Sequence, residues 1–79
     1  MPVDPDLQTA FSTVLRRLRE GRAMTQADLA FEAGVGRVSV TMMETGRRLA
    51  TLPTLFRLAA ALGVSPEEFV AQVREEAGC

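Results

Sequence analysis

The residue types that usually carry enzyme chemistry are scarce in this chain of 79 residues. The sequence has no His, Trp or Tyr, and its single cysteine, Cys79, is the last residue. These counts argue against a metal centre, a disulfide framework and a Cys–His nucleophile pair. One close carboxylate pair, Asp28 and Glu32, lies within a predicted helix, but no basic or nucleophilic group is arranged around it. We therefore expect no enzyme activity, no metal and no cofactor.

Arginine is the only cation, and the arginines are concentrated in the middle of the chain. Eight of the nine basic residues lie within residues 16–57, together with four acidic residues, whereas both ends of the chain are acidic. The net charge of −1 hides this separation. A basic segment can present a positive face to a polyanion. The same arginines could equally be solvated surface residues, so charge alone leaves both interpretations open.

Start and stop signals divide the sequence into five predicted helices, and no segment alternates strongly enough to predict a strand. The predicted helices run from the Asp4-Pro5 cap to Gly21, from the Thr25 cap to Gly34, from Gly36 or Arg37 to just before Gly46, from the Thr51 cap to Gly63, and from the Ser65 cap to about Glu75. We predict an all-α fold in one domain over residues 1–79, with an ordered core at about 5–76 and loose residues at 1–3 and 77–79. The apolar stretches are much shorter than a membrane span, and the acidic N-terminus does not resemble a signal peptide, so we expect a cytoplasmic protein without membrane contact.

The third predicted helix carries residues that core packing does not explain. At 100° per residue, its inward face holds three residues: Ser39, Val40 and Met43. The opposite arc holds two polar and two apolar residues: Arg37, Val38, Thr41 and Met42. Each apolar residue alone could simply be an exposed surface residue. Together with the short capped helix and the turn before them, these side chains indicate a binding partner.

A short helix, a tight turn and a second helix with an outward reading face form the helix-turn-helix arrangement for the DNA major groove. Arg37 could donate two hydrogen bonds to a guanine, and Thr41 could bond to a base edge. Val38 and Met42 could pack on thymine methyl groups.

Four further residues are placed to contact the DNA backbone. Thr25 and Gln26 lie at the start of the second helix, where free N–H groups and the helix dipole favour a phosphate. Arg47 and Arg48 directly follow the third helix, beside the predicted groove contact. Such contacts position a protein on DNA without reading its sequence.

Several segments resemble the Cro/repressor-type, or XRE-family, helix-turn-helix regulators. They are Thr25-Gln-Ala-Asp-Leu-Ala30, Ala33-Gly-Val35, Met43-Glu-Thr-Gly-Arg-Arg48 and Leu58-Ala-Ala-Ala-Leu-Gly-Val-Ser65. The resemblance covers about residues 14–69. It implies a five-helix, lambda-repressor-like domain that reads DNA with its second and third helices and binds a two-fold operator as a dimer. It also implies a phosphate contact by Gln26 and base contacts by five residues: Arg37, Val38, Ser39, Thr41 and Met42.

The resemblance further implies an ion pair between Arg19 and Glu44 that joins the first and third helices, although Arg19 could instead belong to a solvated arginine face. Among small relatives, it points to phage-type regulators, restriction–modification controller proteins and antitoxins. Controller proteins of this size dimerise through the fifth helix, where Phe69, Val70 and Val73 are the candidate contacts. Phe69 and Val73 could alternatively close the core of the single chain.

The sequence therefore predicts a homodimeric, autoregulatory transcriptional regulator that binds a specific double-stranded DNA operator and needs no small-molecule effector. The alternative is a protein-interaction module or antitoxin, in which Val38 and Met42 bind a groove on a protein partner.

Overall fold

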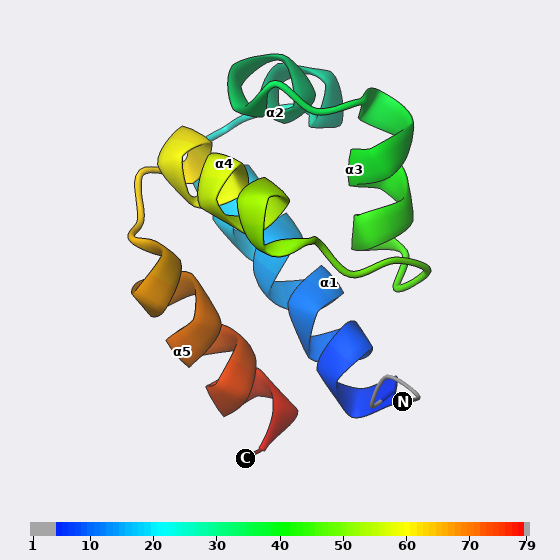
Figure 1. Ribbon diagram of the computed structural model, residues 1–79, viewed down its shortest axis with the longest axis vertical. Coiled ribbons are helices and arrows are strands. Elements are labelled where there is room, and N and C mark those ends of the chain that lie inside the picture. Colours follow the sequence, from blue (N-terminus) through cyan, green and yellow to red (C-terminus); the bar gives the residue numbers. More distant parts are fainter. Residues whose placement is uncertain (1–4, 79) are drawn as a thin grey trace.

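The computed structural model describes residues 5–78, which form five α-helices and no β-strand (Figure 1). The helices are α1 (Pro5–Gly21), α2 (Gln26–Ala33), α3 (Arg37–Glu44), α4 (Leu52–Leu62) and α5 (Pro66–Ala77). The predicted all-α class is confirmed, as is the position of each helix along this part of the chain. Within residues 5–78, no helix is both long enough and apolar enough to cross a membrane.

Local hydrogen bonds determine where the helices begin and end. The predicted N-caps Thr25, Thr51 and Ser65 each accept a hydrogen bond from the backbone N–H three residues later. Such an N–H has no partner within its own helix, so the cap satisfies it. Gly34 and Gly63 end α2 and α4 in the left-handed conformation, which glycine adopts without steric cost.

The C-terminal end of α5 differs from the prediction. The helix continues beyond Glu75 to Ala77, and Gly78 ends it in the left-handed conformation. Ala77 packs against the hydrophobic core, and this contact holds the last turn in place. The helix therefore extends into the residues that were predicted to be loose at this end, up to the cap at Gly78. The predicted cap Asp4 and the other predicted loose residues lie outside the described residues.

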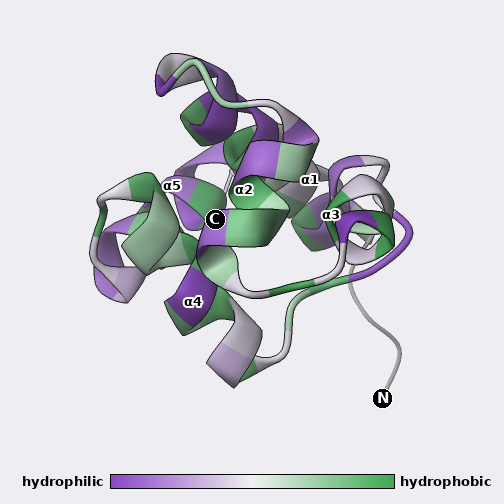
Figure 2. Ribbon diagram, turned by 90° about the horizontal axis from the view of Figure 1, so that it is seen from above, coloured by the Kyte–Doolittle hydropathy of each residue, from purple (hydrophilic) through white to green (hydrophobic). Residues whose placement is uncertain are grey.

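Side chains from all five helices form one hydrophobic core. Helix α1 packs along α5, while α2 packs on α3 and α4, and α3 also contacts α1 (Figure 1). The rings of Phe11 and Phe69 meet in this core, with their centroids 5.6 Å apart. Fully buried side chains such as Leu15, Leu29 and Phe69 each contribute about 1.5–3 kcal/mol. Seen from above, the helices combine hydrophobic and hydrophilic residues (Figure 2), as amphipathic helices around a core do.

Candidate nucleic-acid interface

The turn between α2 and α3 is held by backbone hydrogen bonds. Gly34 has φ 69° and ψ 34°, and its N–H donates to the carbonyl groups of Ala30 and Phe31. A Cβ atom at Gly34 would meet no neighbour within 4 Å, so the backbone conformation, and not a lack of space, favours glycine. Three residues therefore suffice to redirect the chain from α2 into α3, which begins at Arg37.

The face of α3 that points away from the core is open to solvent. Arg37, Val38 and Thr41 are exposed, and Val38 keeps 72% of its surface accessible. Val40 and Met43, on the opposite side, are buried in the core. An arginine, a β-branched apolar residue and a hydroxyl on one exposed helical face can contact DNA base edges and methyl groups.

The two other residues predicted to read bases are less accessible. Met42 is half-buried and therefore offers only part of its side chain to a partner. Ser39 is also half-buried, and its hydroxyl accepts a hydrogen bond from Nη1 of Arg48 at 3.2 Å. Ser39, which was predicted to contact a base, is thus hydrogen-bonded to Arg48, which was predicted to contact a phosphate.

An ion pair anchors the C-terminal end of α3 to α1. Arg19 donates from Nε to Oε2 of Glu44 at 2.6 Å and from Nη2 to Oε1 at 3.0 Å. The Glu44 side chain is fully buried and that of Arg19 is 12% exposed. The hydrogen bonds to Glu44 raise the pKa of Arg19 above its usual value. Arg16 adds a longer contact, with its Nε 3.8 Å from Oε1 of Glu44.

Gln26 turns toward this ion pair, whereas the sequence predicted only a phosphate contact. Its Nε2 donates to Oε1 of Glu44 at 3.1 Å, and its Oε1 accepts from the hydroxyl of Thr41 at 3.0 Å. The side-chain amide has two donor hydrogens, and Glu44 takes one of them. Gln26 thus connects the start of α2 to two residues of α3 and keeps one N–H for a further acceptor.

Thr25 has a structural role at the start of α2. Its Oγ1 accepts from the N–H of Asp28 at 3.0 Å, and its own N–H donates to Oδ2 of Asp28 at 2.9 Å. The hydrogen bond from the Thr25 N–H, and after it the Thr25 side chain, stabilise the charged carboxylate of Asp28 and so lower the pKa of this carboxyl. The reciprocal bonds form a capping box, so the Thr25 hydroxyl is already engaged as an acceptor.

Basic residues flank the exposed face of α3. Arg47 and Arg48 are exposed directly after the helix, as predicted from their position in the sequence. A hollow of mixed polarity between the turn, α3 and α4 has basic and hydroxyl side chains on its border, among them Arg48, Arg57, Thr51 and Thr54. Arg57, which was not among the predicted contacts, lies in the middle of α4 and reaches this hollow from there. Arginines around such a hollow suit an anionic partner.

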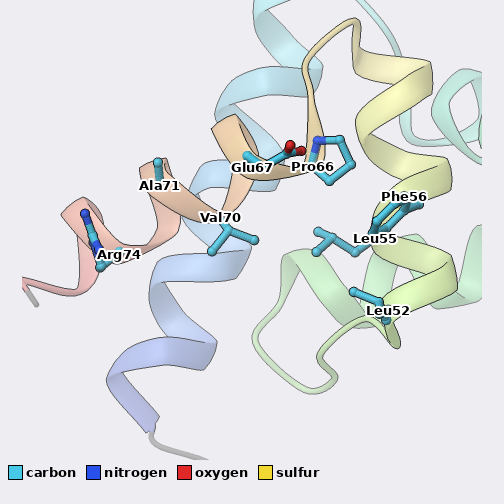
Figure 3. Close-up of a pocket in the computed structure, with 8 residues that line it drawn as sticks. All are labelled: Leu52, Leu55, Phe56, Pro66, Glu67, Val70, Ala71 and Arg74. Carbon is cyan, nitrogen blue, oxygen red and sulfur yellow. The ribbon is translucent and has the colours of Figure 1, made fainter.

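A second surface feature is apolar and lies between α4 and α5 (Figure 3). Leu52, Leu55 and Phe56 of α4 point toward Val70 of α5 across this groove. Leu52, Phe56 and Val70 are 66%, 53% and 51% exposed, which is unusual for large apolar side chains. Leu52 and Phe56 were not among the predicted site residues, although their i, i+4 spacing places both on one helical face.

The three residues predicted for a dimer interface do not share one environment. Phe69 is completely buried and Val73 is 8% exposed, so both belong to the core of the single chain. Only Val70 is open to a partner. Phe31 of α2, which the sequence analysis did not single out, is 87% exposed. Among residues 5–78, no group of three or more cysteine or acidic side chains could hold a metal ion.

Two short helices joined by a tight turn, with the second one exposed outward, define a helix-turn-helix protein. Comparison with known protein families supports this assignment, because the helix-turn-helix family HTH_3 matches residues 15–69. The chain belongs to this family of XRE-type transcriptional regulators.

Relatives with the same fold include regulators of restriction–modification systems. An uncharacterised HTH-type transcriptional regulator of Sinorhizobium fredii, y4dJ, is 34% identical over 70 residues, which cover 89% of this chain and 91% of the relative. The restriction–modification controller protein C.AhdI from Aeromonas hydrophila is 35% identical, with a TM-score of 0.76 over 78% of this chain and 94% of that one. The controller protein C.Esp1396I, crystallised as a tetramer with its natural 35-base-pair operator, is 27% identical, with a TM-score of 0.82 over 92% and 96%.

Proposed function

We propose that this protein is a sequence-specific regulator that binds an operator in double-stranded DNA as a homodimer, with α3 in the major groove. The observation that carries the proposal is the exposed face of α3, where Arg37, Val38 and Thr41 have no role in the core. Arg37 is suited to a guanine and Val38 to a thymine methyl group. The crystallised complex of C.Esp1396I with its operator supports the same use of the fold.

Backbone contacts in this proposal come from arginines beside α3. Arg47 and Arg48 follow its C-terminal end, and Arg57 of α4 borders the same hollow as Arg48. Gln26 contributes through the amide hydrogen that Glu44 does not take. Thr25 contributes through the N-terminus of α2, where the helix dipole favours a phosphate.

The groove between α4 and α5 is the proposed dimer interface. A two-fold axis brings the same patch of both chains together, so the patch must be able to pack against a copy of itself, and apolar side chains can do so without burying an unpaired charge. Leu52, Phe56 and Val70 supply such a patch on the face that Phe69 and Val73 do not reach. This interface keeps α3 of each chain free for one half-site.

We further propose that the regulator acts in the cytoplasm on the promoter of its own gene, without a small-molecule effector. The test is a titration of the purified protein against the DNA directly upstream of its gene and against a shuffled duplex, at two salt concentrations. Binding to the upstream DNA about 10³-fold tighter than to the shuffled duplex is expected for a specific regulator. Equal and weak binding to both duplexes would place the operator elsewhere and remove autoregulation.

The variant Arg37→Ala checks whether α3 reads bases. We expect it to weaken binding to the operator by about 1–3 kcal/mol and to relax the preference at one base pair, with little change on random DNA. An equal loss on both DNAs would mean that Arg37 contacts only phosphate.

The alternative function, binding to a protein partner such as a toxin, is favoured by one observation. Phe31 and Val38 are 87% and 72% exposed, and apolar side chains of this kind suit a protein groove. Absence of binding to any duplex, even at low salt, would support this alternative, because a protein partner requires no counterion release.

A further inference from the structure

The hydroxyl group of Thr41 is the exposed end of a chain of hydrogen bonds that begins in the buried ion pair. The Glu44 carboxylate, held by Arg19, can only accept hydrogen bonds. The group of Gln26 that lies 3.1 Å from Oε1 of Glu44 must therefore be the amide nitrogen. This requirement fixes the orientation of the amide and directs its oxygen toward the hydroxyl group of Thr41.

The proton of the Thr41 hydroxyl is consequently used inside the protein. Two acceptors lie within reach of Oγ1, namely Oε1 of Gln26 at 3.0 Å and the carbonyl oxygen of Arg37 at 3.2 Å. A threonine hydroxyl has one proton and two lone pairs, so either acceptor uses up its capacity to donate. Because Thr41 is exposed on α3, it offers only lone pairs to a molecule that approaches from outside.

An acceptor in the major groove meets few suitable partners. The hydrogen-bond donors there are the exocyclic amino groups, N6 of adenine and N4 of cytosine, whereas guanine and thymine present the acceptors O6 and O4. A threonine whose hydroxyl rotates freely can bond to either kind of base. The fixed proton removes this ambiguity.

We propose that Thr41 accepts a hydrogen bond from an exocyclic amino group and so selects adenine or cytosine over guanine or thymine at one position of each half-site. This inference rests on the proposed binding of α3 in the major groove. Arg19, Glu44 and Gln26 act here as positioning residues, since they orient Thr41 without touching the base.

The experiment is a selection from duplexes of randomised sequence, carried out with the wild-type protein, Thr41→Ser and Thr41→Val. The wild-type protein and Thr41→Ser should both enrich adenine or cytosine at the same position, because serine keeps the hydroxyl. Thr41→Val has the same shape without the hydroxyl, so it should lose this preference or shift it toward thymine, whose methyl group it can contact. Circular dichroism and thermal unfolding of each variant establish that it is folded.

A second measurement needs no variant. In the selected operator, the enriched adenine is replaced by purine, or the enriched cytosine by 2-pyrimidinone, which removes only the amino group. The wild-type protein should bind the altered duplex about threefold to tenfold more weakly, as expected for one lost hydrogen bond. The same replacement should not affect Thr41→Val.

The outcomes separate this inference from the function on which it rests. If the wild-type protein enriches a sequence but Thr41→Val enriches the same one, Thr41 reads no base and the inference is wrong. Enrichment of guanine at the position that depends on Thr41 would show that the hydroxyl donates, which also overturns it. If the wild-type protein enriches no sequence, the proposed DNA-binding function itself fails.

Discussion

Replacement of Arg19 by methionine tests whether the ion pair with Glu44 holds α3 on α1. The variant removes the hydrogen bonds to Glu44 at 2.6 and 3.0 Å, together with the one that Nη1 donates to the Met24 carbonyl at 2.7 Å, and leaves a fully buried carboxylate. Loss of one partner of a buried pair costs about 3–5 kcal/mol. Gln26 and the distant Arg16 remain as partners of Glu44, so we expect a value near 3 kcal/mol.

Urea and thermal unfolding of the purified protein measure this cost. A loss of about 3 kcal/mol lowers Tm by about 12 °C or more in a domain of this size. Arg17→Met is the matched control, because Arg17 lies on the same helix and pairs with Glu76 at 3.0 Å with 51% of its side chain exposed. Its loss should cost less than about 1 kcal/mol, as for other surface pairs.

A double variant separates the charge pair from side-chain packing. Arg19→Met combined with Glu44→Met leaves no buried charge, so it should be more stable than Arg19→Met alone. The reasoning is refuted if Arg19→Met costs no more than Arg17→Met. It is also refuted if the two methionine substitutions destabilise the protein additively.

Three further predictions concern the cap, the flanking arginines and the apolar groove. The pKa of Asp28 is lowered by its bonds with the Thr25 cap, so its charge contributes stability at pH values above the ordinary pKa of about 3.9. This contribution is lost as the pH falls through the lower pKa of the folded state. In urea unfolding, Asp28→Asn should therefore be less stable than wild type at pH about 6, and the difference should shrink at pH about 2.5. Arg47→Ala with Arg48→Ala should weaken binding to all duplexes alike and reduce the slope of log K against log salt by about two, and an unchanged slope would exclude both from the interface. Val70→Asp should raise the dimer dissociation constant by about tenfold or more in analytical ultracentrifugation, whereas Phe31→Asp on α2 should leave it unchanged; equal effects would exclude the groove as the dimer interface.

The sequence predicted the features that depend on local chemistry. The caps Thr25, Thr51 and Ser65 and the stop at Gly34 were identified correctly. Each cap accepts a hydrogen bond from a free N–H group at the start of its helix, and Gly34 ends α2 through bonds to residues close to it in the sequence. The outward orientation of Arg37 followed equally from helical periodicity.

Features that depend on distant parts of the chain were harder to predict. Gln26 turns toward Glu44, which follows 18 residues later, and no local pattern encodes that contact. On α5, Phe69 and Val73 share one helical stripe while Val70 lies about 100° away from Phe69. The sequence shows these two faces, but only the packing of α5 on α1 and α4 decides which of them is buried.

The opposite faces of α3 have consequences for how this protein can evolve. Val40, Met43 and Glu44 hold the helix in place, whereas Arg37 and Val38 project outward and are not part of the core. Exposed residues of this kind can change with little effect on stability. A duplicated copy of the gene could therefore acquire a new operator through a few substitutions on the outward face, while selection on folding continues to preserve the inward one.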